Sequence, residues 1–183
     1  MDAQPISAGH LVFAAARSGA KGTAAATLTI PWERRGDFVR LWRELVARTH
    51  GPEKLSWKRL RRRARPLVGA LFDDLLTREW VQVSAVVSED AADTQADAML
   101  RYALARAGNG NRVRVAKRDL GRAAAAGFRS VRALAPSASA PLRLVRVLAR
   151  ALADAPKRRA QAELAERLAA APQVVVKRMS SET

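Results

Sequence analysis

The 183-residue sequence contains no cysteine. This absence excludes disulfides, thiolate-ligated zinc sites and thiol catalysis. Histidine is almost as scarce, because only His10 and His50 occur and they lie far apart in the sequence. A histidine-rich metal site is excluded as well. We therefore expect neither a metal ion nor a cofactor.

Aromatic residues are also few, at 5% of the chain, although 49% of it is hydrophobic and much of that fraction is alanine. This composition predicts a modest core with close contacts between small residues. No apolar run approaches the roughly 20 residues of a membrane span. The segment Met1–Pro5 lacks the basic region and apolar core of a signal peptide. We expect a soluble, cytoplasmic protein.

Acidic residues are in short supply, with 17 against 33 lysines and arginines, for a net charge of +16. Like charges repel one another in a compact chain, so a polyanionic partner is the simplest explanation for this excess of positive charge. A G·C-rich genome would explain arginine in place of lysine but not the shortage of acids. The charge is also segregated: residues 101–150 carry twelve basic residues and one acid, Asp119. This segregation indicates a binding face for nucleic acid.

The hydrophobic pattern predicts an alternation of strands and helices. Strands are expected where β-branched or alternating apolar residues occur, and helices where apolar residues recur every three or four positions. The predicted strands are 10–17, 24–31, 80–87, 112–117, 128–135 and 173–177, and the predicted helices are 34–49, 66–78, 89–107, 142–153 and 157–170. This order predicts an α/β fold with a mixed central sheet flanked by helices. Residues 1–155 form the domain, and a C-terminal helix and tail at 156–183 are appended to it.

The segment from Lys54 to Arg65 holds seven basic residues and no acid. Basic residues around Trp57 suit contact with phosphates together with base stacking, which contributes about 1–3 kcal/mol per base. The alternative, which we favour for Trp57 taken alone, is that this ring anchors the core at the start of a helix. The arginines themselves favour binding.

No set of residues forms a credible active site. Asp73 and Asp74 are adjacent, and adjacent helical residues point in different directions. The Gly108–Asn111 loop lacks the Gly-Lys-Ser/Thr ending of a phosphate-binding loop. We therefore predict that the protein is not an enzyme.

Short motifs follow one another in a recognisable order over residues 10–153. They are Ala16-Arg17-Ser18-Gly19 at the end of the first strand, Thr27–Pro31 in the second, the helix from Arg34, Leu55-Ser56-Trp57-Lys58, Trp80–Val87, Val113–Arg118 and Leu142–Arg146. In this order the chain resembles a degenerate member of the RNase H-like domain-of-unknown-function family 3800. The resemblance implies an RNase H-like fold in which the first and fourth strands are neighbours.

The departures from that family concern its carboxylates. Members carry Asp-Glu-Ser-Gly after the first strand, an Asp near the end of a later strand, and Leu-Gln-x-x-Asp in the C-terminal helix. RNase H-like nucleases hold two metal ions with clustered carboxylates. The corresponding positions here are Ala16 and Arg17, Lys117 or Arg118, and Arg146. Guanidinium groups repel a cation but hold a phosphate well, so the resemblance implies a pseudonuclease with Arg17, Lys117, Arg118 and Arg146 close together.

We therefore expect non-catalytic binding of RNA or DNA, with other protein subunits, in an assembly such as an RNA-guided defence or mobile-element complex. The predicted nucleic-acid-binding residues are Arg17, Lys54, Trp57, Lys58, Arg59, Arg61, Arg62, Arg63, Arg112, Arg114, Lys117, Arg118 and Arg146. Two alternatives stay open. One is a metal-dependent RNase H-like nuclease with displaced carboxylates, drawn from Glu53, Asp73, Asp74 and Asp119. The other is a structural subunit that binds an acidic protein.

Overall fold

The computed structural model describes residues 9–52, 54–89, 97, 100–102, 105, 112–125, 130–135 and 138–179. The chain forms a six-stranded mixed sheet with the strand order β5-β4-β1-β2-β3-β6. The strands are β1 (His10–Gly19), β2 (Gly22–Pro31), β3 (Gln82–Ser88), β4 (Arg112–Val115), β5 (Val131–Ala133) and β6 (Val174–Met179). The predicted α/β class is confirmed, and all six predicted strands are present.

The register of the sheet begins with a long hairpin. β1 and β2 pair antiparallel from His10 and Pro31 at the open end to Gly19 and Gly22 at the turn. Gly22 has a φ of +122°, and a Cβ there would lie 2.8 Å from the Cα of Glu89, so this position requires glycine. β3 continues the sheet antiparallel to β2, and β6 pairs parallel with β3.

On the other side of the hairpin, β4 pairs parallel with β1 and β5 pairs parallel with β4. The first and fourth strands are therefore neighbours, as expected. This strand order is consistent with an RNase H-like arrangement. Because β1 and β4 are parallel, their carboxyl ends lie at the same edge of the sheet.

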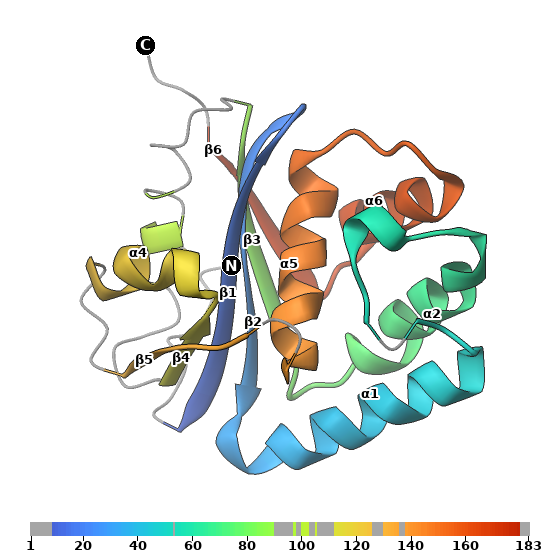
Figure 1. Cartoon of the computed structure of the whole chain (residues 1–183), viewed down its shortest axis with the longest axis horizontal. Helices are drawn as coiled ribbons and strands as arrows, with labels where there is room; N and C mark the ends of the chain where they lie inside the picture. Colours follow the sequence, from blue (N-terminus) through green and yellow to red (C-terminus); the bar gives the residue numbers. More distant parts are fainter. Residues whose placement is uncertain are drawn as a thin grey trace.

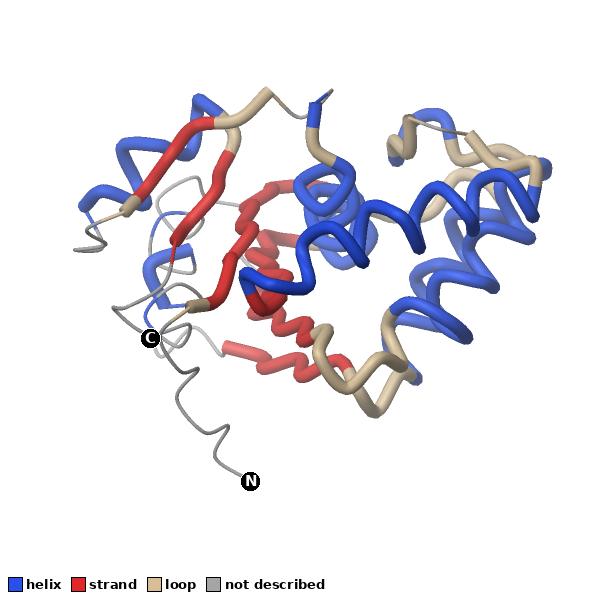
Figure 2. The backbone as a smooth tube through the Cα atoms, turned by 90° about the horizontal axis from the view of Figure 1, so that it is seen from below, coloured by secondary structure: helices blue, strands red, loops and turns tan. Residues whose placement is uncertain are grey.

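Helices cover both faces of the sheet (Figure 1). The helices are α1 (Arg35–Thr49), α2 (Arg65–Ala70), which continues into a π-helical turn (Leu71–Leu75), α4 (Leu120–Ala125), α5 (Ala140–Ala153) and α6 (Arg159–Ala170). Helix α5 packs on β1 and β2, with α1, α2 and α6 on the same side, and α4 lies on the opposite face against β4 and β5. The view from below also shows the strands between the two groups of helices (Figure 2). Among the described residues, no helix is long and apolar enough to cross a membrane.

Two apolar clusters form the core, one on each face of the sheet. Along β1, Leu11, Phe13 and Ala15 belong to the cluster under α5, whereas Val12 and Ala14 belong to the cluster on the other face. This alternation follows from the two-residue period of a strand. Because both faces are covered, the strand reads in the sequence as a continuous apolar run. The predicted contacts between small residues are also present, since many of the fully buried side chains are alanines.

The predicted helices and strands differ from the structure in three places. Of the predicted strand 128–135 the structure describes residues 130–135, where the strand is Val131–Ala133, and the short helix α4 before it was not predicted. A six-residue helix that contains Gly121 offers too little periodic pattern to be recognised. The predicted helix 66–78 is interrupted at Leu71, whose carbonyl accepts a hydrogen bond from the amide of Leu76, five residues on, at 2.8 Å. The predicted helix 89–107 falls mostly outside the described residues.

Trp57 is a core residue. Its side chain is 7% exposed and packs in the cluster that includes Leu60 and Leu67. Its carbonyl accepts a hydrogen bond of 2.8 Å from Nε2 of Gln161 on α6. The interpretation of Trp57 as a core anchor is confirmed. A ring buried to this degree exposes little surface on which a base could stack, which argues against the expected stacking role.

Candidate functional site

A basic groove lies where the carboxyl ends of β1 and β4 meet α5. Its volume is about 250 Å³, and six of its ten lining residues are basic. The lining residues are Arg17, Leu55, Ser56, Trp57, Lys58, Arg118, Arg143, Arg146, Val147 and Arg150. We refer to this site as the basic groove.

The strand and helix periods explain why arginines from three elements meet here. On β1, Arg17 follows Leu11, Phe13 and Ala15 at two-residue steps, so it points to the same face, toward α5. On α5, Arg143, Arg146 and Arg150 are spaced by three and four residues and therefore share one side of the helix. Arg118 reaches the groove from the 3-10 turn Lys117–Asp119, which directly follows β4.

The groove residue Arg17 pairs with Asp119, which does not itself line the groove. Both side chains are buried, and Nη1 of Arg17 lies 3.6 Å from Oδ2 of Asp119. Nη1 of Arg17 also donates a hydrogen bond to the carbonyl of Ala16. The second terminal nitrogen, Nη2, is buried and has no hydrogen-bond partner among the residues that the structure describes. The guanidinium of Arg17 is thus paired with the carboxylate of Asp119 and still has one N–H donor group, Nη2, available for a ligand.

The pKa of Arg17 is lowered to about 10, first by burial and then by repulsion from Arg118, while Asp119 partly offsets both. The pKa of Arg146 is lowered for the same two reasons, burial and then Arg118. Both side chains still carry their charge at neutral pH. The lowered pKa values show that these cations are held where positive charge is unfavourable, and a bound anion would relieve that cost.

The arginines of the groove differ in their partners. Nη1 of Arg150 donates to the carbonyl of Ser18 at 2.6 Å, and its Nε lies 3.1 Å from Oδ2 of Asp154. Arg118 and Arg146, by contrast, make no hydrogen bond or ion pair with any residue that the structure describes. Arg118 is exposed and Arg146 is half-buried. These two guanidinium groups are the donors that a ligand in the groove would meet.

The turn after β1 fixes the position of α5 relative to the groove. The amide of Lys21 donates to the carbonyl of Ala153 at 2.9 Å, and the amide of Ala20 donates to Oδ1 of Asp154 at 3.3 Å. A Cβ at Gly19 would lie 2.5 Å from the Ala153 carbonyl oxygen. Glycine at this position thus lets the end of α5 dock on the hairpin, which sets the distance between Arg17 and the α5 arginines.

The structure brings together only some of the predicted residues. Arg17, Lys58, Arg118 and Arg146 line the groove, whereas the adjacent Lys117 is exposed and does not. The other predicted basic side chains that are described do not line the groove. Lys54, Arg61, Arg62 and Arg63 are exposed outside it, and Arg112 and Arg114 lie on β4 before its carboxyl end. The side chain of Arg59 is not described. Of the described basic side chains of the Lys54–Arg65 segment, Lys58 alone therefore lines the groove.

Two groove residues, Arg143 and Arg150, were not predicted. Their signal was present in the sequence, since they stand three residues before and four residues after Arg146 in a predicted helix. On an α-helix these intervals place side chains on one face.

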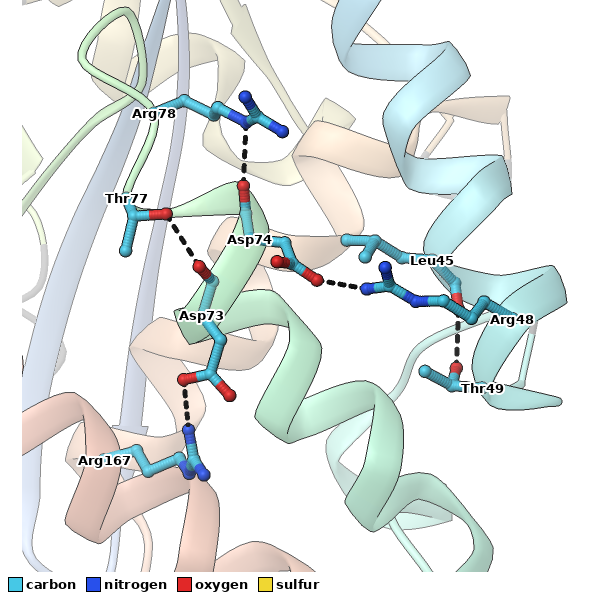
Figure 3. A network of polar contacts seen from close by, with 8 residues as sticks. All are labelled: Leu45, Arg48, Thr49, Asp73, Asp74, Thr77, Arg78 and Arg167. Carbon is cyan, nitrogen blue, oxygen red and sulfur yellow. Dashed lines mark hydrogen bonds and ion pairs between the residues drawn. The ribbon is translucent and has the colours of Figure 1, made fainter.

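The carboxylates of the nuclease alternative do not converge. Oδ1 of Asp73 accepts a hydrogen bond of 2.9 Å from Arg167, and Asp74 pairs with Arg48 (Figure 3). The two side chains point in different directions, as expected for adjacent helical residues. Asp119 pairs with Arg17, a residue of the basic groove. Glu53 lies outside the described residues, and among those described no group of three histidine, aspartate or glutamate side chains could hold a metal ion.

Comparisons with protein-family models, with curated proteins and with solved structures found no match to this chain. The geometry and charge of the groove are therefore the basis for a functional proposal.

Proposed function

We propose that this protein binds the phosphate backbone of a nucleic acid in the basic groove, without cleaving it. The observation that supports the proposal is the pair Arg118 and Arg146, which have no hydrogen-bond or ion-pair partner among the described residues and stand beside the buried cation Arg17. Like charges so close together repel each other, and the repulsion grows as water is excluded. A phosphate between them would replace that repulsion by attraction.

Arginine suits this ligand better than lysine would. Its planar guanidinium presents two parallel N–H donors that match two phosphate oxygens, and it stays charged at every physiological pH. The excess charge of the whole chain, +16, extends attraction beyond the groove and favours a polyanion over a single small anion. Either RNA or DNA supplies the same backbone chemistry.

A pseudonuclease is the form of this proposal that the family resemblance suggests. Arginines occupy positions where that family has metal-binding carboxylates, so the groove would retain the shape of a nuclease site and bind its substrate passively. We place the function in the cytoplasm, within an assembly whose other protein subunits confine a chain that would otherwise bind polyanions indiscriminately. An RNA-guided defence or mobile-element complex fits that description.

The experiment that tests the proposal measures affinity with a variant that lacks the two unpaired cations. Fluorescence anisotropy with labelled RNA and DNA should show strong binding to the native protein and a large loss in the double variant Arg118→Ala, Arg146→Ala. The matched control is Arg159→Ala, Arg178→Ala, because both arginines are exposed, lie outside the groove, and have no partner among the described residues. Equal losses in the two double variants would mean that binding is diffuse.

The same assay separates nucleic acid from an acidic protein. Unlabelled RNA or DNA, heparin and polyglutamate are each added as competitors of the labelled nucleic acid, at equal charge concentration. Displacement by polyglutamate at least as effective as by RNA or DNA would favour the acidic-protein alternative. Displacement by nucleic acid at much lower concentration supports the proposal.

A further inference from the structure

A second cavity lies beside the basic groove, at the other end of β1. It has a volume of about 670 Å³ and lies between β1, β2, α1 and the segment that leads into α5. Most of its lining is apolar, including Phe13, Ile30, Trp42 and Val46. We refer to it as the apolar cavity. Its size is typical of sites that bury an organic group.

Arginines surround this apolar lining. Arg35, Arg43, Arg114 and Arg143 all line the cavity. The pKa of Arg114 is lowered by burial and then by the neighbouring Arg132 and Arg112, which shows a further gathering of positive charge on this face. An apolar pocket framed by cations suits a ligand with a flat apolar body and a negatively charged attachment.

The apolar cavity and the basic groove share one lining residue. Arg143 lines both of them. From Arg143 to Arg150 the α5 axis advances roughly 10 Å, at 1.5 Å per residue. This length is about the axial rise of three nucleotides in one strand of B-DNA, at ~3.4 Å each. A strand lying along these arginines thus reaches from the groove to the cavity within a few nucleotides.

Trp32 completes the wall of the cavity with a ring that already binds cations. The guanidinium of Arg35 lies 4.3 Å, and that of Arg112 lies 4.0 Å, from the centroid of this ring. Aromatic rings and arginine planes are the surfaces on which proteins stack unpaired bases, and arginine also bonds to base edges. Of the predicted residues outside the groove, Arg114 lines this cavity, and Arg112 lies over the ring of Trp32.

We infer that the apolar cavity receives an unpaired nucleobase of the same strand whose phosphates lie in the basic groove, so that the ligand is a single-stranded segment or strand end rather than a duplex. The inference rests on the proposed function and narrows its substrate class. In a duplex the bases are stacked and paired inside the helix, so a base could enter the cavity only after unstacking and unpairing, which costs a few kcal/mol.

Three labelled oligonucleotides of about 12 nucleotides, within the ~4–16 that single-strand grooves track, test this inference. One is single-stranded, one is a duplex, and one is a single strand of abasic sugars with the same number of phosphates. The native protein should bind the base-containing single strand roughly tenfold more tightly than the abasic strand, which is the effect of one well-stacked base. The duplex should bind no better than the abasic strand.

A matched pair of variants locates the effect. Val39 lines the cavity on α1 and is 36% exposed, and Val175 on β6 is 52% exposed and outside it. Val39→Glu places a carboxylate at the cavity and should reduce the ratio between base-containing and abasic strands toward one. Val175→Glu adds the same charge and should leave the ratio unchanged. Because the two strands carry equal phosphate, the ratio is insensitive to the general loss of positive charge.

Tryptophan fluorescence of the native protein provides a second test of the inference. Trp32 and Trp42 line the cavity, so a base inserted there should quench part of the tryptophan emission, whereas the abasic strand should not.

The outcomes are distinct. Equal affinity for all three oligonucleotides, or a base preference that Val39→Glu leaves intact, overturns the inference while the proposed function stands. Failure to bind any of the three overturns both.

Discussion

Arg17 at the end of β1 and Asp119 after β4 form a buried ion pair across two neighbouring strands, with Nη1 and Oδ2 3.6 Å apart. The pair joins the two strand ends from which the basic groove is built. Asp119 is fully buried and Arg17 is 7% exposed, so neither charge is compensated by water. The first two predictions follow from this relationship.

Removing either partner alone should destabilise the protein, because the other charge stays buried without compensation. We expect Asp119→Asn and Arg17→Met each to lower the free energy of unfolding by about 3–5 kcal/mol. The double variant should lose clearly less than the sum of the two. Urea denaturation of the four proteins provides the double-mutant cycle. Additive losses would show that the two side chains do not interact.

The stability of the native protein should rise with pH in the alkaline range, relative to Arg17→Met. The pKa of Arg17 is lowered to about 10 in the folded chain, below that of the free side chain in the unfolded chain. Above about pH 10 the unfolded chain therefore binds more protons than the folded one, and the free energy of unfolding increases with pH. Denaturation between about pH 8 and about pH 11 measures the difference in stability between the two proteins, in which contributions common to both cancel. A difference that does not change with pH would contradict the lowered pKa.

The dependence of binding on salt should report the number of phosphate contacts. The logarithm of the affinity should fall linearly with the logarithm of salt concentration, with a slope of about −0.7 to −0.9 for each phosphate neutralised. Arg118→Ala, Arg146→Ala should make that slope shallower by about 1.5 if each arginine contacts one phosphate.

The control for the salt experiment is Arg159→Ala, Arg178→Ala, which should keep the slope of the native protein. Arg158 and Arg167, at the start of α6 and within it, are poor controls because both have partners. Arg158 donates to the carbonyl of Lys58, and Arg167 pairs with Asp73. An affinity of the native protein that hardly varies with salt would disprove backbone binding.

Gly19→Ala should disturb the groove without removing any charge. Its Cβ would lie 2.5 Å from the carbonyl oxygen of Ala153, so the end of α5 must move away from the hairpin. We expect a loss of stability of about 1–3 kcal/mol, typical of overpacking, and weaker binding of nucleic acid. Gly36→Ala is the matched control, because a Cβ there meets no atom within 4 Å. Thermal unfolding and anisotropy should show no loss for that variant.

The purified protein should leave labelled RNA and DNA intact in the presence of Mg²⁺ or Mn²⁺. The reason is that Asp73, Asp74 and Asp119 are each paired with a different arginine and lie in separate places. Gel electrophoresis after prolonged incubation measures cleavage. Metal-dependent cleavage that disappears in Asp73→Asn or Asp119→Asn would refute the prediction and support the nuclease alternative.

The sequence by itself determined the order of strands and helices, because apolar periodicity is a local property of the chain. The two-residue and three-to-four-residue patterns were sufficient for β1 to β3 and for α1, α5 and α6. They failed for α4, which is too short to show a period, and they did not indicate the π turn at Leu71. The basic charge and its segregation were also readable without a structure.

Tertiary structure decided which basic residues act together. The run from Lys54 to Arg65 was the densest in the sequence, yet of its basic residues with described side chains only Lys58 lines the groove, because the segment turns its apolar residues, Trp57 among them, into the core. Arg17, Arg118, Arg146 and Arg150 are spread over more than 130 positions and meet because β1 and β4 are parallel neighbours and α5 docks on the hairpin at Gly19. Such a meeting depends on strand pairing and helix packing over long sequence distances, which local patterns of residues do not encode.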